Sequence, residues 1–351
     1  MTGGFEATPT DNIKREQMYN GSFQDKVKPS VIAYIVTVCV ALLLWLIPFD
    51  PTFYLSKAGS LRFMALMESL VDIPDIVAYW VNFAFILLIG FILGFINNAF
   101  SLLRASTILP TVLCIFVMII SLEKDSVSHG YVLTLIELAI IASAFALSES
   151  YNEMHSFNIG GLIAIGSIVY TPFSLNVIPV VAFLYFSNRM QLKSILSIII
   201  GGLTIAIYAV AGIYQLGYFE GMSWTATPSF SLNDFSEFET FGRFSKIFYG
   251  YLLAFILVCT MRLSSHYSNK SIQQRGKFSL LVVIIMLAIF FAVAMNYGFE
   301  SMLSTIITLG TFCIGGAVTL FYKRELLITW MYRLFILLAV GYLVVKLIGL
   351  E

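Results

Sequence analysis

Two aspartates that follow a polar stretch are the first residues in this chain that can do acid-base chemistry. Asp72 and Asp75 are separated by Ile73 and Pro74, just before a long apolar stretch begins. One carboxylate can act as a general base, or the pair can orient a metal ion. The residues before them, 61–71, place apolar side chains over much of one helical face, which predicts a helix lying along a membrane surface. Asp72 and Asp75 are therefore the candidate catalytic residues.

A second polar stretch, 214–246, interleaves aromatic side chains with charged ones. Aromatic faces stack on sugar rings, and charged groups between them can bind hydroxyls. The candidate substrate-binding residues of this stretch are Trp224, Glu237, Glu239 and Arg243. An aromatic belt at the membrane interface explains the same composition, and we prefer that interpretation of the aromatics.

Glu137 is the only acid that lies well inside an apolar stretch. An ionised carboxylate is expensive in hydrocarbon, so this side chain is expected to face the interior of a helix bundle and to have a polar partner. It is the best single candidate for binding a proton or a substrate. The structural alternative is a hydrogen bond to a neighbouring helix, for example through Asn82.

Several function classes find no support in the sequence. It contains no P-loop, no GxGxxG motif after a strand, no HExxH and no GxSxG. The four cysteines and three histidines show no metal-ligand spacing, so no metal site is predicted from them. A net charge of +0 without a contiguous basic face gives nucleic acid nothing to bind. No cofactor is expected from these motifs.

The elements that must position these residues are membrane-spanning helices. The chain of 351 residues is 59% hydrophobic and only 11% charged, with a mean hydropathy of +0.90, so the bilayer must be its solvent. About 20 apolar residues cross a hydrocarbon core of roughly 30 Å as helix. On this rule we predict an all-α bundle of eleven helices, at 30–48, 76–99, 107–121, 131–148, 157–169, 173–187, 194–213, 247–262, 279–295, 303–322 and 326–348.

The two short helices at 157–169 and 173–187 depend on one sequence feature. Tyr170, Thr171 and Pro172 interrupt an apolar segment that is otherwise long enough for a single helix, and proline disfavours helical geometry before it. Two short crossings are therefore predicted. One long kinked helix and a re-entrant hairpin are the alternatives.

The distribution of lysine and arginine predicts the orientation. With the N-terminus inside, most of the 20 cationic residues fall in cytoplasmic joints, as the positive-inside rule requires. Residues 1–29 then form a disordered cytoplasmic tail, 30–351 form the transmembrane domain, and 49–75 and 214–246 are external loops. The C-terminus is predicted to be periplasmic.

Two stretches carry a family resemblance: 97–110, which reads NNAFSLLRASTILP, and 157–172, which reads FNIGGLIAIGSIVYTP. With Ser150 and Tyr151 between them, they resemble an uncharacterised family of bacterial multi-pass inner-membrane proteins. More distantly, the layout of loops is similar to glycosyltransferases of the GT-C type and to O-antigen polymerases. This likeness implies a polyprenyl-linked glycan as partner at the outer face, and it allows a divalent metal as cofactor. GT-C enzymes carry adjacent acids, whereas Asp72 and Asp75 are separated.

Three functions are open at this point. The first is transfer or polymerisation of polyprenyl-linked glycan, with Asp72 or Asp75 as the base. The second is a non-catalytic subunit or scaffold of an envelope-assembly complex, with other membrane proteins as partners. The third is a secondary transporter that uses Glu137 near the break at Pro172.

Overall fold

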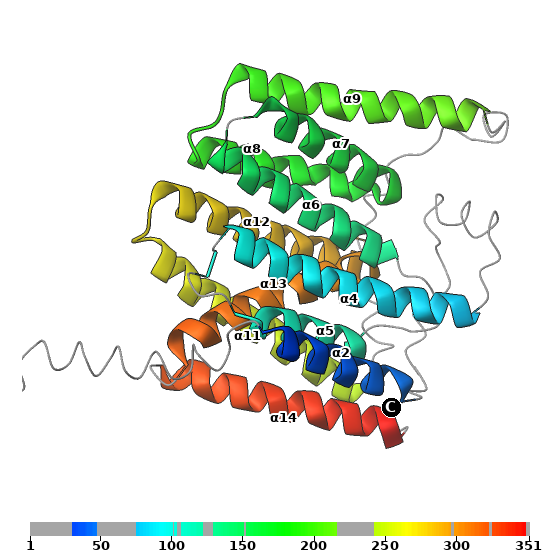
Figure 1. Cartoon of the computed structure of the whole chain (residues 1–351), viewed down its shortest axis with the longest axis vertical. Coiled ribbons are helices and arrows are strands. Elements are labelled where there is room, and N and C mark those ends of the chain that lie inside the picture. The colour runs from blue at the N-terminus through cyan, green and yellow to red at the C-terminus, as the bar shows by residue number, and fades with distance from the viewer. Residues whose placement is uncertain are drawn as a thin grey trace, which may run out of the picture.

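The fold is all-helical in the part of the chain that the structure describes. The computed structural model describes residues 30–47, 75–100, 102–103, 107–121, 129–150, 152–215, 242–295, 298–322 and 325–348. These residues form eleven α-helices and one 3₁₀ helix (Figure 1). Their bounds are α2 Val31–Leu46, α4 Asp75–Phe100, α5 Leu109–Ser121, α6 His129–Glu149, α7 Glu153–Val169, η1 Thr171–Asn176, α8 Val177–Phe186, α9 Leu192–Gln215, α11 Arg243–Tyr267, α12 Ile272–Ala294, α13 Gly298–Phe321 and α14 Leu326–Ile348.

The predicted helix bundle is confirmed at this level. Seven of the described helices are long and apolar enough to cross a membrane, namely α4, α6, α9, α11, α12, α13 and α14. Helices α2 and α5, and η1 together with α8, are shorter apolar segments. The predicted tail 1–29 and most of the two predicted loops lie outside the described residues. The loop predicted at 214–246 is shorter than expected, because α9 runs to Gln215 and α11 begins at Arg243.

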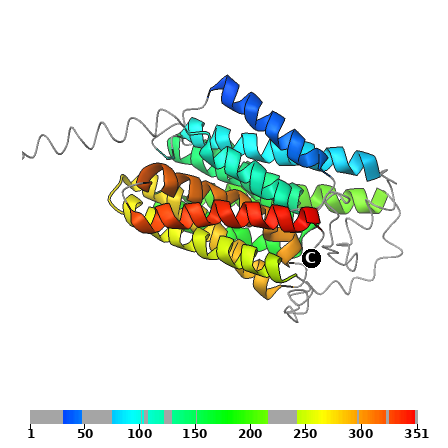
Figure 2. The same cartoon turned by 90° about the horizontal axis from the view of Figure 1, so that it is seen from below.

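Successive helices run in opposite directions, so the bundle has two ends (Figures 1 and 2). At one end Lys277 pairs with Glu149, Arg262 with Glu325, and Arg189 bonds to the carbonyl of Ser148. We call this the basic end, and its described cations are Arg189, Lys193, Arg262, Lys270, Arg275 and Lys277. At the opposite end Tyr249 bonds to the Ser121 carbonyl and Lys346 to the Ile120 carbonyl. The described cations there are Arg243, Lys246 and Lys346.

Helix α13 forms the centre of the bundle, and α9 and α14 lie at its periphery. The apolar stretch of α13 is 94% buried, against 6% for α9 and 11% for α14. In Figure 1, α9 and α14 lie at opposite ends of the long axis, with α13 between them. Helices α5, α6, α11 and α12 pack directly on α13. Lipid would therefore cover α9 and α14, whereas α13 contacts protein on nearly all sides.

The break predicted at Tyr170 is present, and it divides 153–186 into an antiparallel pair. Helix α7 ends at Val169, Tyr170 adopts an extended conformation, and Pro172 lies in the first turn of η1. The Tyr170 ring packs edge-on against Phe291, near the end of α12 that lies opposite the basic end. Helix α7 begins at the basic end, and α8 leads back to that end, where Arg189 bonds to the Ser148 carbonyl. Helices α7 and α8 therefore extend through most of the bundle and back.

Candidate functional site

The structure describes side chains for only two of the predicted site residues. Glu137 is buried in α6, and Arg243 is exposed at the first turn of α11. Asp75 is the first residue of α4, but its side chain lies outside the described part. Asp72, Trp224, Glu237 and Glu239 also lie outside it. No hydrogen bond or ion pair joins Glu137 to Arg243 among the described contacts, so these two residues do not form one site.

Glu137 faces the interior of the bundle, as predicted. Its side chain is 2% exposed, and its Oε2 accepts a hydrogen bond of 2.7 Å from Nδ2 of Asn176. Asn82, which the sequence suggested as a possible partner of Glu137, is buried in α4 and does not make this bond. The other carboxyl oxygen, Oε1, is buried and has no hydrogen-bond partner. Glu137 is therefore a buried acid with only one of its two oxygens hydrogen-bonded.

The interruption of the helical pair places Asn176 beside Glu137. Helix α7 ends at Val169 because Pro172 follows Tyr170-Thr171, and the amide of Phe173 then bonds to the Tyr170 carbonyl to start η1. The Phe173 ring folds back onto Gly166, where a Cβ would lie 2.2 Å from the ring. Glycine is thus needed at 166 for this turn to form. Asn176 is the last residue of η1 and faces α6 from inside the bundle.

A second polar contact on α6 connects it to the central helix α13. Thr134 Oγ1 lies 2.7 Å from Ser304 Oγ and 2.9 Å from Thr305 Oγ1. One turn nearer the start of α6, His129 Nε2 lies 2.7 Å from Ser301 Oγ. Sequence reasoning missed this contact, although the signal is present in the sequence: hydroxyl residues at 301, 304, 305 and 308 repeat at helical spacing. Small hydroxyl residues commonly join helices within membranes.

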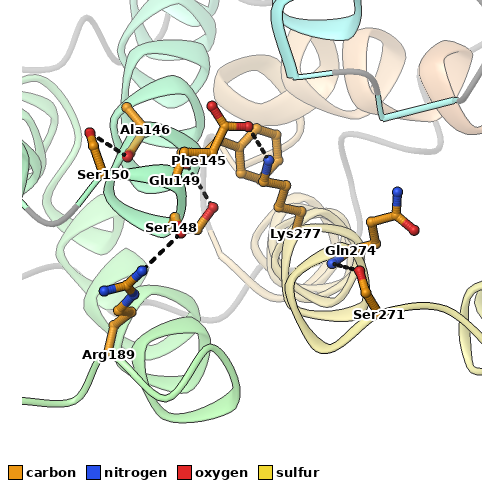
Figure 3. Close-up of polar contacts among 9 residues, drawn as sticks. All are labelled: Phe145, Ala146, Ser148, Glu149, Ser150, Arg189, Ser271, Gln274 and Lys277. Atoms are coloured by element: carbon orange, nitrogen blue, oxygen red, sulfur yellow. Dashed lines mark hydrogen bonds and ion pairs between the residues drawn. The ribbon is translucent and has the colours of Figure 1, made fainter.

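The basic end holds a third polar cluster, drawn in Figure 3. The Lys277 ammonium lies 2.7 Å from Glu149 Oε1 (Figure 3). It also lies over the rings of Phe100 and Phe145, at 5.3 and 5.8 Å from their centroids. The Lys277 side chain is 8% exposed and that of Glu149 is 50% exposed. Two aromatic faces and one carboxylate therefore replace the hydration shell of this lysine. Arg189 points to the same end of α6, where its guanidinium donates to the Ser148 carbonyl at 3.2 Å.

The helix predicted at 279–295 begins earlier than expected. Helix α12 begins at Ile272, with Ser271 as its N-cap, so Lys277 lies in the second turn. The missed signal is Ser271 followed three residues later by Gln274, the pattern of a capping box. The Ser271 hydroxyl accepts a hydrogen bond of 3.4 Å from the backbone N–H of Gln274 (Figure 3). Because several residues between 271 and 277 are polar, a hydropathy criterion does not detect the start of this helix.

The described residues include no group of three or more His, Cys, Asp or Glu side chains placed to hold a metal ion. The divalent metal considered for Asp72 and Asp75 concerns side chains outside this part of the chain. Comparison with family models, with curated proteins and with solved structures finds no match for the chain. The likeness to bacterial inner-membrane proteins and to GT-C enzymes therefore stays a prediction.

Proposed function

We propose that the chain is a bacterial inner-membrane transporter that couples movement of its cargo to protonation of Glu137. The observation that carries the proposal is the unpaired, buried Oε1 of this carboxyl group. A purely structural acid would be expected to have both oxygens bonded, because an unsatisfied buried polar atom costs free energy. Ionisable residues within membrane helices are rare and usually belong to proton or substrate pathways.

Neither protonation state of Glu137 is fully satisfied by its present neighbours. The ionised form has one donor, the Asn176 amide, for two oxygens. The protonated form gains an O–H that needs an acceptor, and the described neighbours of Oε1 supply none. A proton or a polar cargo group can therefore improve the hydrogen bonding at Oε1.

The donor to Glu137 lies on a segment suited to movement. Asn176 ends a 3₁₀ turn between two helices, and discontinuous helices commonly form the binding sites of transporters. Before this turn, α7 packs tightly on α9. A Cβ at Gly160 would lie 1.9 Å from the Ile198 carbonyl oxygen, and one at Gly201 would lie 2.1 Å from that of Phe157. Helices α7 and α9 thus form a close pair, and α7 leads directly into the turn that carries Asn176.

The cation distribution supports a cytoplasmic basic end, with the N-terminus inside and the C-terminus periplasmic. A single cysteine at Ser271, the N-cap of α12, tests this orientation with a membrane-impermeant maleimide. The reagent is expected to label it in inside-out vesicles and not in intact cells. The parent protein without the added cysteine gives the background, and labelling in intact cells would contradict the orientation.

Glycan transfer and a scaffold role stay predictions. Glycan transfer depends on Asp72 and Asp75, and its direct test is whether Asp72→Asn causes lipid-linked sugar to accumulate. The described residues offer no observation that favours either role over transport.

A dye-quenching assay in inside-out vesicles tests the transport proposal. Respiration acidifies the vesicle interior, and an acridine dye reports the gradient while sugars, amino acids, organic cations and inorganic anions are added in turn. Wild-type vesicles are expected to dissipate the gradient with at least one class, and Glu137→Gln vesicles with none. Glu153→Gln, which removes a half-exposed acid at the start of α7, is the matched control. Equal dissipation by wild type and Glu137→Gln, or by neither, contradicts the proposal.

A further inference from the structure

A hollow of about 360 Å³ lies at the basic end, where α8 ends and α12 begins. Phe186, the last residue of α8, lines it together with Ile272, the first residue of α12. The first two turns of α12 add the polar side chains of Arg275 and Ser279. Gly276 also lines the hollow and is buried, and α8 and α12 pack directly on each other. The hollow is therefore a depression between two packed helices, with polar side chains on one of them.

Arg275 is the cation of this hollow, and no described group neutralises it. Its side chain is exposed, and the described contacts include no ion pair or hydrogen bond of its guanidinium. The described acids of the basic end already pair with other cations: Glu149 with Lys277, Glu153 with Lys193, and Glu325 with Arg262. An anion from outside the described chain is thus the partner that Arg275 requires.

Ser279 adds a second donor to the same side of α12. It lies four residues after Arg275, and residues at this spacing are neighbours on a helical surface. Its hydroxyl makes no hydrogen bond among the described contacts. A guanidinium offers a planar fork of N–H donors that fits phosphate oxygens, and a hydroxyl beside it can donate to the same group. The polar side of the hollow therefore matches one phosphate group.

The hollow lies at the level of lipid headgroups. Helix α12 has 23 residues and is about 34 Å long at 1.5 Å per residue, little more than a hydrocarbon core of roughly 30 Å. The residues of α12 that line the hollow fall within its first 10 Å or so. This position is where the headgroups of one leaflet meet their acyl chains.

Apolar surface continues from the hollow along both helices. On α12, Met286 and Phe290 are exposed seven and eleven residues after Ser279, which places them on the same face. On α8, Ile178 is exposed eight residues before Phe186 and shares its face. Acyl chains attached to a phosphate in the hollow would pack against these side chains.

We propose that this hollow binds the headgroup of an anionic two-chain phospholipid such as phosphatidylglycerol, with Arg275 and Ser279 donating to its phosphate. An ethanolamine headgroup fits less well, because every described carboxylate of the basic end already has a cation and none is left for its ammonium. Basic pockets between membrane helices on the cytoplasmic side commonly bind anionic headgroups, and under the proposed orientation the lipid belongs to that leaflet. The inference is independent of the proton-binding role of Glu137, since the two sites share no residue.

Native mass spectrometry of the delipidated full-length protein with dioleoylphosphatidylglycerol tests the proposal. Wild type is expected to bind a first lipid molecule, and Arg275→Gln to bind it about tenfold more weakly, the effect of losing one charge-assisted hydrogen bond. Ser279→Ala should weaken binding about fivefold, as expected for a neutral donor. Lys270→Gln is the matched control, because it removes one charge from the turn before α12 without touching the hollow, and it should bind like wild type.

Two competing probes separate the sources of the phosphate and the role of charge. Neither dioleoylphosphatidylethanolamine nor water-soluble glycerol 3-phosphate is expected to displace the bound lipid at equal concentration. Displacement by the first would show that the net charge of the headgroup is irrelevant, and displacement by the second would assign the hollow to a soluble phosphate compound. Either result overturns the proposal.

Wild-type affinity in Arg275→Gln, or an equal loss in Arg275→Gln and Lys270→Gln, would also overturn it. Monodispersity and unfolding in SDS check that the variants are folded, and Ser279→Ala carries the same test at a residue without described polar contacts. Failure of these tests would leave the vesicle assay on Glu137 unaffected, so the two proposals are distinguishable.

Discussion

Helix α6 carries two buried polar contacts that differ in how completely their groups are paired. On the side facing α13, the Thr134 hydroxyl meets two other hydroxyls, Ser304 and Thr305, within 2.9 Å. On the side facing the α7–α8 pair, Glu137 has one amide donor for two oxygens. The first contact joins neutral groups that can each donate and accept. The second leaves one oxygen of an ionisable group without a hydrogen-bond partner.

This difference separates a packing contact from a candidate site. Hydroxyls can rotate to satisfy one another, and an unpaired neutral hydroxyl such as that of Ser156 costs less than an unpaired charged group. An unpaired carboxyl oxygen is more costly, because the group can become charged. We therefore expect substitutions on the α13 side to change stability, and substitutions at Glu137 to change function.

The largest expected loss of stability is at the α7–α9 contact that supports the Asn176 turn. Gly160→Leu would force a side chain into the Ile198 carbonyl, and overpacking of this kind costs about 3 kcal/mol or more. Unfolding by SDS in mixed micelles measures it. Gly212→Leu, on the same helix pair but with nothing within 4 Å of its Cβ, is expected to behave as wild type. Equal stability of the two variants would refute the close pairing of α7 and α9.

Removing the hydroxyl on the α13 side should have a smaller effect. Thr134→Val keeps the shape of the side chain but deprives Ser304 and Thr305 of a partner, at a cost of about 1–2 kcal/mol for a hydrogen bond between membrane helices. The same SDS titration reads this loss. Proton-coupled activity per folded molecule should remain at the wild-type level, and a selective loss of activity would assign function to the wrong face of α6.

The pair at the basic end should respond asymmetrically to its two substitutions. Glu149→Gln leaves the buried Lys277 ammonium without its carboxylate, for which we expect a loss of about 1 kcal/mol because Glu149 is half-exposed. Lys277→Met removes the buried charge and retains contact with Phe100 and Phe145, so it should be closer to neutral. If Lys277→Met proves the more destabilising change, then the stabilisation from the Lys277–Glu149 ion pair exceeds the free-energy cost of burying the Lys277 charge.

The smallest change in stability is expected at Glu137 itself. Glu137→Gln retains an oxygen that can accept from Asn176 and removes the ionisable group, so unfolding should shift by no more than about 0.5 kcal/mol. Expression and the SDS midpoint check this value. A loss as large as that of Thr134→Val would indicate a structural role and favour the scaffold alternative.

The helices could be predicted from the sequence because membrane spans obey a simple length rule. Most described bounds agree with the predictions to within a few residues, and Tyr170-Thr171-Pro172 correctly predicted a broken segment. The start of α12 at Ile272 was missed because its first two turns are polar, with Gln273, Gln274 and Lys277 where hydropathy expects a loop.

The partners of the buried polar groups could not be predicted in the same way. Burial of Glu137 follows from the cost of a carboxylate in hydrocarbon, but the choice of Asn176 over Asn82 depends on how α6, α4 and η1 pack. The Thr134 contact joins positions 170 residues apart. Such pairings belong to tertiary structure, and a single sequence carries no record of them. The role of Asp72 and Asp75 stays a prediction.

The most direct test of the account is reaction of Glu137 with dicyclohexylcarbodiimide, which modifies protonated carboxyl groups in apolar surroundings. Native membranes would be treated between about pH 5 and pH 9, a range that begins above the ordinary pKa of a glutamate, about 4.3. The modified peptides would be quantified by mass spectrometry. The account predicts labelling of Glu137 that falls as the pH rises, with no labelling of Glu149 or Glu153, which are half-exposed and paired with lysines. Absence of labelling at Glu137 throughout this range, or equal labelling of all three acids, would contradict the claim that Glu137 is the proton-binding residue.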